Sequence, residues 1–479
     1  MDRDNHIDRG SMRASPARPL RRLLEGPAGD RLLRAAIGML YSERLRPLAL
    51  GATRALLPSI VNARPGAAGR SDPERLAFAR AIVETCARQA PAGALPRRFL
   101  ELAGAMVTAP YHADPDRPWL LAIAPTRSCN LSCARCYAGS TGDAAGSLSF
   151  AELDRIVTEA SDRWRVRTIV LTGGEPFLYH SGGAGVIDLI ERHPELMFLI
   201  FTNGTLIDAR LARRLARAGN AAVAVSFEGM ERATDERRGP GVFGSAVRAL
   251  SLLKEAGALS GISMTVTRQS CEELFSDALL DFFFVENAVS FGFVFQYMPE
   301  GRDADPRLMP TPDQRLWLWE RSWQVVRDRG ILLFDFWNHG SLLGGCIAAG
   351  RGRGYLYIDW DGNVLPCVFA PFTDRNLKEV YARGGGLDEA WASPLLASIR
   401  DWQQAHSQSG VVVSRGRDGG LMCACPVRDH YADFAEMVLA AGAAPTDAVT
   451  GSCMASQDYH RMMVEHGRDL AELVGAPDR

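Results

Sequence analysis

Lysine is almost absent from this chain of 479 residues, in which Lys254 and Lys378 stand against 52 arginines. Acidic and basic residues nevertheless nearly balance, at 56 and 54, and the formal net charge is −2. No basic run with interleaved aromatic residues occurs. Such a chain has neither the overall field nor the local patch that a phosphate backbone requires. We therefore expect no nucleic-acid partner.

The chain also lacks long hydrophobic runs. No stretch reaches 18 uninterrupted apolar residues, which argues against a membrane-spanning helix. The first ten residues are polar and contain no apolar signal-peptide core. We therefore expect a cytoplasmic protein. In that reducing compartment, ten cysteines indicate thiols or metal ligands rather than disulfides.

Composition and periodicity divide the chain into four regions. Residues 1–118 are basic and helical in pattern, 119–300 alternate strand and helix, 301–345 form a linker with helical parts, and 346–479 hold the five late cysteines. Six apolar runs with helical segments between them predict an α/β fold with a parallel sheet curled into a partial (β/α)6 TIM barrel. The six runs are 119–124, 168–171, 197–201, 221–227, 261–266 and 291–295.

Local signals predict where several helices begin and end. Ser71 and Glu74 have the spacing of a capping box, with a proline at the first helical position between them. Ser149 and Glu152 repeat that spacing before an apolar helical face. Gly219 predicts the end of a helix that follows the third strand.

Three cysteines follow the first predicted strand in the spacing C-x3-C-x2-C, namely Cys129, Cys133 and Cys136. Three thiolates on one short loop hold three irons of a cubane and leave the fourth iron open for a ligand. The alternative is a structural zinc site, which requires a fourth ligand close by, usually in paired C-x2-C form. The spacing favours the iron–sulfur cluster.

Two further motifs stand at the predicted carboxyl ends of strands, where a βα barrel carries its chemistry. Gly-Gly-Glu-Pro follows the second strand; its glycines allow close backbone approach to a ligand, and its carboxylate suits an ammonium group. Thr-Asn-Gly follows the third strand and offers small hydrogen-bonding groups. Each motif alone is also compatible with an ordinary β–α turn. The residues are Gly173, Gly174, Glu175 and Pro176 in the first motif and Thr202 and Asn203 in the second.

In this order and spacing, the three motifs resemble those of the radical S-adenosylmethionine (SAM) enzymes, over roughly residues 119–296. The resemblance implies a 4Fe–4S cluster on the three early cysteines, with its open iron chelated by the amino and carboxylate groups of SAM. It also implies that Gly173, Gly174 and Glu175 hold the methionine amino group. No Asp-x-His-x-x-Gly motif occurs, so we do not expect the cobalamin-dependent branch.

Four other residues take expected roles from the same resemblance. Tyr137, the aromatic residue after the last cysteine of the motif, is expected beside the adenine. Ser226, after the fourth strand, is expected to contact the ribose or the carboxylate of SAM. Glu228 stands where relatives often carry Asp. Arg238 is either a partner of the SAM carboxylate or a solvated loop arginine.

The late cysteines resemble the auxiliary-cluster modules called SPASM and twitch. Cys346 and Cys367 enclose a hairpin-like Asp-Gly-Asn turn, as at the start of such modules. Downstream, Cys423 and Cys425 form C-x-C and Cys453 stands alone, which departs from a full SPASM pattern. We therefore expect one auxiliary 4Fe–4S cluster on Cys346, Cys367 and Cys425, with Cys423, Cys453 or no residue as the fourth ligand. The alternative is that these cysteines are buried small apolar side chains, as we expect for Cys86 and Cys271.

The resemblance implies an enzyme in which an external electron, from a donor such as flavodoxin or ferredoxin, cleaves SAM to a 5′-deoxyadenosyl radical. That radical abstracts hydrogen from the substrate, while the protein orients the substrate and excludes water. No catalytic protein side chain is assigned. The alternative from another class is a non-catalytic iron–sulfur or zinc scaffold.

The N-terminal region decides the expected substrate. Ribosomal-peptide maturases of this kind commonly carry a winged-helix module for the leader peptide, and residues 1–118 show no such strand alternation. An apolar stripe at 32–40 with arginines nearby suits either packing on the barrel or docking on an anionic membrane surface. We therefore expect a small-molecule or lipid-like substrate ahead of a peptide.

Overall fold

The computed structural model describes residues 73–89, 116–339, 345–409 and 422–475, except positions 144 and 353, together with six separate positions between 47 and 55. The stripe at 32–40 and most of the expected N-terminal region lie outside the described residues. No helix among those described is long and apolar enough to cross a membrane.

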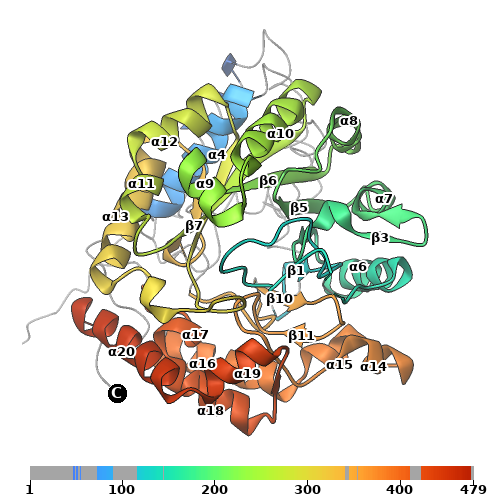
Figure 1. Cartoon of the computed structure of the whole chain (residues 1–479), viewed down its shortest axis with the longest axis vertical. Coiled ribbons are helices and arrows are strands. Elements are labelled where there is room, and N and C mark those ends of the chain that lie inside the picture. Colours follow the sequence, from blue (N-terminus) through green and yellow to red (C-terminus); the bar gives the residue numbers. More distant parts are fainter. Residues whose placement is uncertain are drawn as a thin grey trace, which may run out of the picture.

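A nine-stranded sheet forms the centre of the molecule, and its curvature produces the partial barrel in Figure 1. All six predicted strands are present and pair in parallel, in the order β1, β2, β5, β6, β7, β8. Their register brings their carboxyl ends to one rim, which positions the site. These strands are β1 (Leu120–Ile123), β2 (Thr168–Leu171), β5 (Met197–Thr202), β6 (Ala221–Phe227), β7 (Leu259–Val266) and β8 (Phe291–Gln296).

Three further strands extend the sheet beyond those predicted. β9 (Leu333–Asp335) pairs in parallel with β8, and β10 (Tyr355–Ile358) pairs in parallel with β1. β11 (Val364–Leu365) returns antiparallel to β10. Because β10 and β11 belong to the region 346–479, that region is joined to the barrel by backbone hydrogen bonds.

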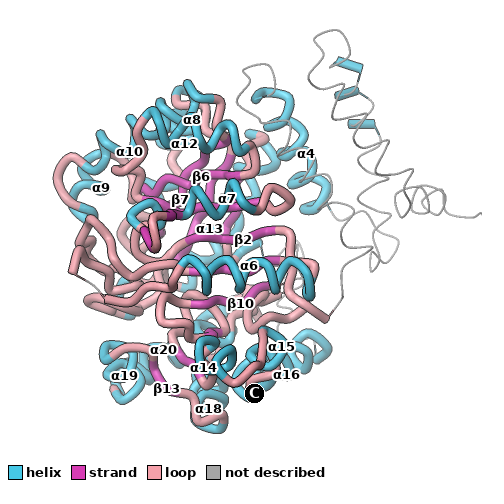
Figure 2. The backbone as a smooth tube through the Cα atoms, turned by 90° about the vertical axis from the view of Figure 1, so that its right-hand side faces the viewer, coloured by secondary structure: helices cyan, strands magenta, loops and turns pink. Residues whose placement is uncertain are grey.

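Helices cover the outside of the sheet (Figures 1 and 2). The capping box predicted at Ser149 and Glu152 is present, with each side chain accepting the other residue's backbone N–H. The helix predicted to end at Gly219 also does so, in the left-handed conformation. The outer helices are α6 (Phe150–Trp164), α7 (Val186–Arg192), α8 (Ala209–Ala218), α9 (Glu231–Arg238), α10 (Val242–Ala256), α11 (Cys271–Leu274), α12 (Asp277–Asp281) and α13 (Pro312–Arg329).

The N-terminal helix α4 (Pro73–Gln89) begins at the proline that was predicted as its first helical position, whereas Ser71 of the predicted capping box lies outside the described residues. It packs beside α13 and β9: the ring of Phe78 lies 4.8 Å from that of Phe334, centroid to centroid, in an edge-on arrangement. Gln89 Nε2 donates to the carbonyl of Ala288 at 2.9 Å. This helix therefore covers the side of the barrel near β9.

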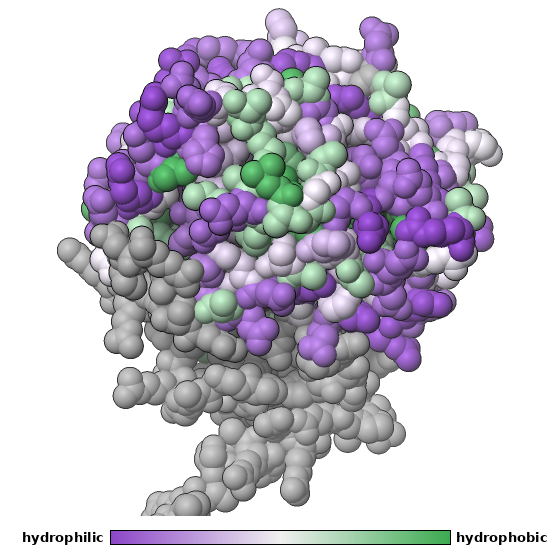
Figure 3. All heavy atoms as spheres, turned by 90° about the horizontal axis from the view of Figure 1, so that it is seen from below, coloured by the Kyte–Doolittle hydropathy of each residue, from purple (hydrophilic) through white to green (hydrophobic). Residues whose placement is uncertain are grey.

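The C-terminal helices form a layer beneath the barrel in the view of Figure 1. Seen from below in Figure 3, apolar residues gather in a small central patch among hydrophilic ones. The helices of the layer are α14 (Leu377–Ala382), α15 (Leu387–Trp391), α16 (Pro394–Ser409), α17 (Pro426–Asp429), α18 (Tyr431–Ala440), α19 (Ala448–Ala455) and α20 (Gln457–Leu473).

Two small sheets of two strands each complete the described strands. They are β3 (His180–Ser181) with β4 (Ala184–Gly185) and β12 (Phe372–Thr373) with β13 (Ala444–Pro445).

A buried charge cluster joins this layer to the barrel. Arg315 of α13 donates from Nη1 to Asp429 Oδ1 at 2.7 Å and from Nη2 to the carbonyl of Met422 at 2.8 Å. Arg428 donates to the same Asp429 oxygen at 2.9 Å and to Gln296 Oε1, at the end of β8, at 2.7 Å. Burial alone would raise the pKa of Asp429, but the two guanidinium groups outweigh it and hold that pKa below its usual range.

Replacing Asp429 by Asn should destabilise the protein strongly, because two buried guanidinium groups would then face a neutral amide. Breaking a buried ion pair from one side costs about 3–5 kcal/mol. The matched control is Asp458→Asn on α20, whose exposed pair with Arg461 should contribute about 1 kcal/mol or less. Denaturant unfolding of both variants measures this difference. Equal free energies of unfolding for the two variants would contradict the assigned role of the cluster.

Candidate active site and auxiliary cysteine site

The three early cysteines, hereafter the core cysteines, lie on the loop between β1 and α6. Cys129 is buried, whereas Cys133 and Cys136 are half-buried, and all three are free thiols. Burial raises the pKa of Cys129 to about 11. The following strand fixes this loop, because the backbone N–H groups of Gly174 and Glu175 each donate to loop carbonyls at 2.9 Å.

Two arginines outside the loop support its carbonyl groups. Arg302, just after β8, donates from Nη1 to the carbonyl of Cys133 at 2.7 Å and from Nη2 to that of Ser140 at 2.8 Å. Arg237, near the end of α9, donates to the carbonyl of Ala134 at 3.2 Å. Their positive charge lies where a thiolate-bound cluster would carry negative charge. Sequence reasoning missed both roles, since neither arginine belongs to a motif near the cysteines.

A glycine beside Arg302 shows how closely these segments approach. Gly301 has φ +69°, and a Cβ built on it would lie 2.2 Å from the carbonyl oxygen of Cys136. A side chain would therefore displace the cysteine loop. The sequence signal that could have indicated this contact is the pair Gly301-Arg302, shortly after the sixth predicted strand.

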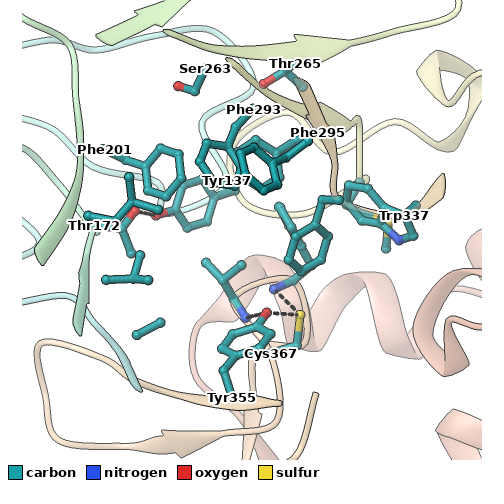
Figure 4. A pocket seen from close by; sticks show the side chains of 18 of the residues that line it. Tyr137, Thr172, Phe201, Ser263, Thr265, Phe293, Phe295, Trp337, Tyr355 and Cys367 are labelled. Carbon is teal, nitrogen blue, oxygen red and sulfur yellow. Dashed lines mark hydrogen bonds between the residues drawn. The ribbon is translucent and has the colours of Figure 1, made fainter. Parts of the chain in front are cut away.

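The two glycines of the Gly-Gly-Glu-Pro motif bring the end of β2 against the cysteine loop. A Cβ on Gly174 would lie 2.1 Å from the carbonyl oxygen of Ser128, and Gly173 has φ +108°. The N–H of Gly173 donates to the hydroxyl of Tyr137 at 3.2 Å, and that hydroxyl lies 2.8 Å from Thr172 Oγ1. The two glycines therefore lie close to the cysteine loop itself, and the contact with Gly173 orients Tyr137 (Figure 4).

Glu175 is a buried carboxylate that joins the ends of β2 and β5. It accepts hydrogen bonds from Thr202 Oγ1 at 2.7 Å and from the backbone N–H of Asn203 at 2.8 Å. Burial raises its pKa, although these donors act in the opposite direction. Pro176, also buried, begins a short 3-10 turn directly after it. The expected contact of Glu175 with an ammonium group stays a prediction.

Asn203 connects this carboxylate to the core cysteines. Its side-chain Nδ2 lies 3.8 Å from Cys129 Sγ and donates to Asn130 Oδ1 at 2.9 Å. Asn130 in turn donates to Thr205 Oγ1 at 2.8 Å. The two sequence motifs and the cysteine loop therefore meet in one hydrogen-bonded group.

The remaining expected SAM contacts lie in the last residues of β6 and just after it. Ser226 Oγ is 3.0 Å from Ser263 Oγ on β7. Arg238 donates to Glu228 Oε1 at 2.5 Å, and Arg237 donates to the other oxygen of the same carboxylate. Arg238 is thus held by Glu228 rather than solvated. Its proposed role toward the SAM carboxylate stays a prediction.

A cavity of about 870 Å³ connects the core cysteines with late cysteines. Its wall between them is mostly aromatic, and Figure 4 shows the rings of Phe201, Phe293 and Phe295 beside Tyr137. Phe336 and Trp337, which follow β9, also line it. The volume lies in the range of small-molecule sites.

Three of the five late cysteines, hereafter the auxiliary cysteines, line this cavity: Cys346, Cys367 and Cys425. Burial raises the pKa of Cys425 to about 12, with further contributions from Asp429 and Cys346. Burial also raises the pKa of Cys367, and Cys346 and Cys425 add to that effect. Cys367 therefore lies within electrostatic reach of Cys346 and Cys425, and Cys425 within that of Cys346. The hydroxyl of Tyr355 lies 2.8 Å from Cys367 Sγ (Figure 4), a contact that no sequence motif indicated.

The other two late cysteines are placed differently. Cys453 lines a separate small cavity with Glu300 and Tyr459. Cys423 is buried, and its electrostatic neighbour is Arg315 of the charge cluster. The structure thus brings together the three late cysteines that the sequence favoured, and their assignment as ligands stays a prediction.

The two remaining cysteines were expected to be apolar packing residues. Cys86 belongs to α4, but its side chain lies outside the described residues. Cys271 is buried at the start of α11, where its Sγ donates to the carbonyl of Thr267 at 3.2 Å. It does not line the cavity between the two cysteine sites.

Two protein-family models match the regions of the chain that carry the core and auxiliary cysteines. The model of the radical SAM superfamily matches residues 123–274, and the SPASM model, described as an iron–sulfur cluster-binding domain, matches residues 346–411. Together these matches include all the core cysteines and two of the auxiliary cysteines. The resemblance deduced from the sequence motifs is confirmed.

Individual proteins are also similar to this chain. Mycofactocin maturase MftC of Mycobacterium ulcerans is 33% identical over 304 residues, which cover 60% of this chain and 79% of that protein. AdoMet-dependent heme synthase of Oleidesulfovibrio alaskensis is 32% identical over 291 residues, covering 54% and 72%. The solved structure of Streptococcus suis SuiB has 18% identity and a TM-score of 0.48, covering 77% of this chain and 83% of that one.

Replacing Gly174 by Ala should empty the core site. Its Cβ would meet backbone oxygens of the cysteine loop at 2.1 and 2.6 Å, so the loop must move and misalign its thiols. Iron content after anaerobic reconstitution should fall by about four per chain, one cubane. The matched control is Gly244→Ala in α10, where nothing lies within 4 Å of the added methyl. Full iron content in the Gly174 variant would contradict the account of the loop.

Proposed function

The chain belongs to the radical SAM superfamily, and we propose that it is a peptide maturase that also uses an auxiliary iron–sulfur cluster. The observation that carries this proposal is the single cavity lined by both the core and the auxiliary cysteines. A substrate in that cavity would contact the place where hydrogen is abstracted and the auxiliary site together.

Family membership makes the protein an enzyme whose cofactors are a 4Fe–4S cluster and SAM, with auxiliary iron–sulfur at the SPASM region. The bound cluster and SAM supply a 5′-deoxyadenosyl radical that abstracts hydrogen from the substrate. The donor sets fit these groups: three thiols on a single loop suit a cluster with an open iron. The guanidinium groups that donate to the loop's carbonyls suit the negative charge of a thiolate-bound cluster.

The residues around the core cysteines take binding and orienting roles in this proposal. Tyr137, held by Thr172 and the N–H of Gly173, forms a fixed aromatic wall for the adenine. The ends of β2 and β5, which Glu175 joins, line the cavity and present backbone groups to the methionine part of SAM. Ser226 and Arg238, which line the same cavity, face the ribose and the carboxylate.

The auxiliary cysteines hold one cluster in this proposal, as in a twitch-like module. Cys346, Cys367 and Cys425 would hold this cluster, which would supply an electron acceptor for the substrate radical or a group that positions the substrate. The aromatic wall between the two sites excludes water from the radical. A small external electron carrier such as flavodoxin or ferredoxin is the expected reductant of the core cluster.

The peptide alternative has better support than the small-molecule or lipid-like substrate that the N-terminal composition favoured. A relative named as a maturase is 33% identical, and this chain covers 79% of it. A relative named as a heme synthase covers less of this chain, and it favours a small-molecule tetrapyrrole as the second candidate. We propose that a short segment of a precursor peptide enters the aromatic cavity.

Turnover of a peptide tests this proposal. Anaerobically reconstituted protein is incubated with dithionite, SAM and synthetic candidate precursor peptides. We expect 5′-deoxyadenosine and a changed peptide mass, both lost when Cys129, Cys133 and Cys136 are replaced by Ala. Cys271→Ala is the matched control and should behave as the wild type, because this thiol lies outside the cavity.

Two results would contradict different parts of the proposal. Formation of 5′-deoxyadenosine by the triple variant would contradict the assignment of the core site. Conversion of an iron porphyrin precursor by an enzyme that leaves the peptide unchanged would contradict the peptide substrate and favour the tetrapyrrole candidate.

A further inference from the structure

A cluster of two histidines and one aspartate lies in the C-terminal helical layer, outside the cavity. His406 belongs to α16, His430 lies between α17 and α18, and Asp433 belongs to α18. One ligand atom from each residue lies within 4.8 Å of the other two. We propose that these three residues bind a divalent transition-metal ion, with Zn²⁺ as the first candidate.

The hydrogen bonds of the two histidines favour metal binding. His406 Nδ1 lies 2.8 Å from the carbonyl oxygen of Trp402, which only accepts, so this nitrogen carries the proton. The lone pair then belongs to Nε2, which is 3.7 Å from Asp433 Oδ2. His430 Nε2 likewise donates to the carbonyl of Cys423 at 3.1 Å, which leaves the lone pair on Nδ1. Metal-bound histidines typically donate their other N–H to a carbonyl in this way.

One tryptophan orients two of the three candidate ligands. The indole Nε1 of Trp402 donates to Asp433 Oδ2 at 2.8 Å. Its ring also stacks on the imidazole of His406, with centroids 3.6 Å apart and an angle of 25° between the planes. These contacts hold His406 and the carboxylate before any ion arrives, which lowers the cost of ordering them on binding.

The donor set and its exposure indicate which ions fit. Two imidazole nitrogens and a carboxylate oxygen suit Zn²⁺ and its neighbours in the first transition row. His406 is buried, whereas His430 and Asp433 are half-buried, so solvent reaches the site from one side. Water is therefore available as the further ligand that zinc requires. The absence of sulfur from this set distinguishes it from both cysteine sites.

The position of the site suggests a structural role for the ion. His430 contacts the carbonyl of Cys423, two residues before the auxiliary Cys425. His406 and Asp433 come from α16 and α18, which pack against each other. An ion held by all three would fasten these helices to the segment that carries Cys425. The rival arrangement is a simple His406–Asp433 ion pair, which requires no metal.

Zinc binding to the cluster-loaded protein tests the proposal, because the iron–sulfur clusters then occupy the core and auxiliary cysteines. After equilibrium dialysis against Zn²⁺, elemental analysis should find one zinc per chain in addition to the iron. Asp433→Asn keeps an acceptor for Trp402 but removes the charge, and His430→Gln removes an imidazole. Each should weaken zinc binding at least about 10-fold, since even supporting residues typically contribute that much. The matched control, His180→Ala, changes an exposed histidine outside the site and should bind zinc normally.

Cobalt provides a readout that does not depend on the variants. Co²⁺ bound by imidazole and carboxylate shows visible d–d absorption without the intense charge-transfer band of a cobalt–thiolate bond. The proposal is overturned if wild-type protein takes up no zinc beyond its iron, or if its cobalt spectrum shows thiolate ligation. Zinc uptake by the Asp433 and His430 variants equal to that of the His180 control would also overturn it.

Discussion

The loop between β1 and α6 depends on hydrogen bonds from outside itself, because its described residues between the two elements form no helix or strand. Backbone N–H groups at the end of β2 and the side chains of Arg237 and Arg302 satisfy its carbonyl groups. Unsatisfied buried carbonyls would be costly, so these partners determine where the core cysteines lie. The barrel rim thus positions a loop that also makes backbone hydrogen bonds of its own, such as those from Arg127 to Gly146 and from Cys129 to Thr141.

The auxiliary site also depends on hydrogen bonds that hold the segment carrying its cysteines in place. Asp429 accepts the N–H of Cys425 at 3.1 Å while it pairs with both Arg315 and Arg428. This buried cluster reaches Gln296 at the end of β8, so the C-terminal layer is held against the rim of the barrel. With β10 paired to β1, the two cysteine sites belong to one packed unit. A shared cavity between them follows from this joint packing.

Much of the fold could be predicted from the sequence because its signals are local. Apolar runs predicted the six parallel strands, and the capping box at Ser149 predicted the start of α6. The predicted hairpin turn at 361–363 is present, with β10 and β11 on either side of it. β9 was missed because it is only three residues long, and the pairing of β10 with β1 was missed because β1 lies more than 200 residues earlier in the chain. Their formation depends on tertiary contacts, which no short window reveals.

The same distinction between local signals and tertiary contacts applies to the candidate site. The core cysteines and Glu175 stand in short motifs, so they could be identified from the sequence. The sequence did not indicate that Glu175 joins two strand ends. Arg302 acts on a loop that precedes it by more than 160 residues. The cluster of His406, His430 and Asp433 likewise has no sequence pattern.

The proposed function depends on two cysteine sites that face one cavity. Iron content and electron paramagnetic resonance of reduced protein test this claim, with Cys346, Cys367 and Cys425 replaced by Ala in one variant and the core cysteines in another. We predict about eight irons per chain in the wild type and about four, with a cluster signal, in each variant; about four irons in the wild type, or no signal once the core cysteines are removed, would contradict it.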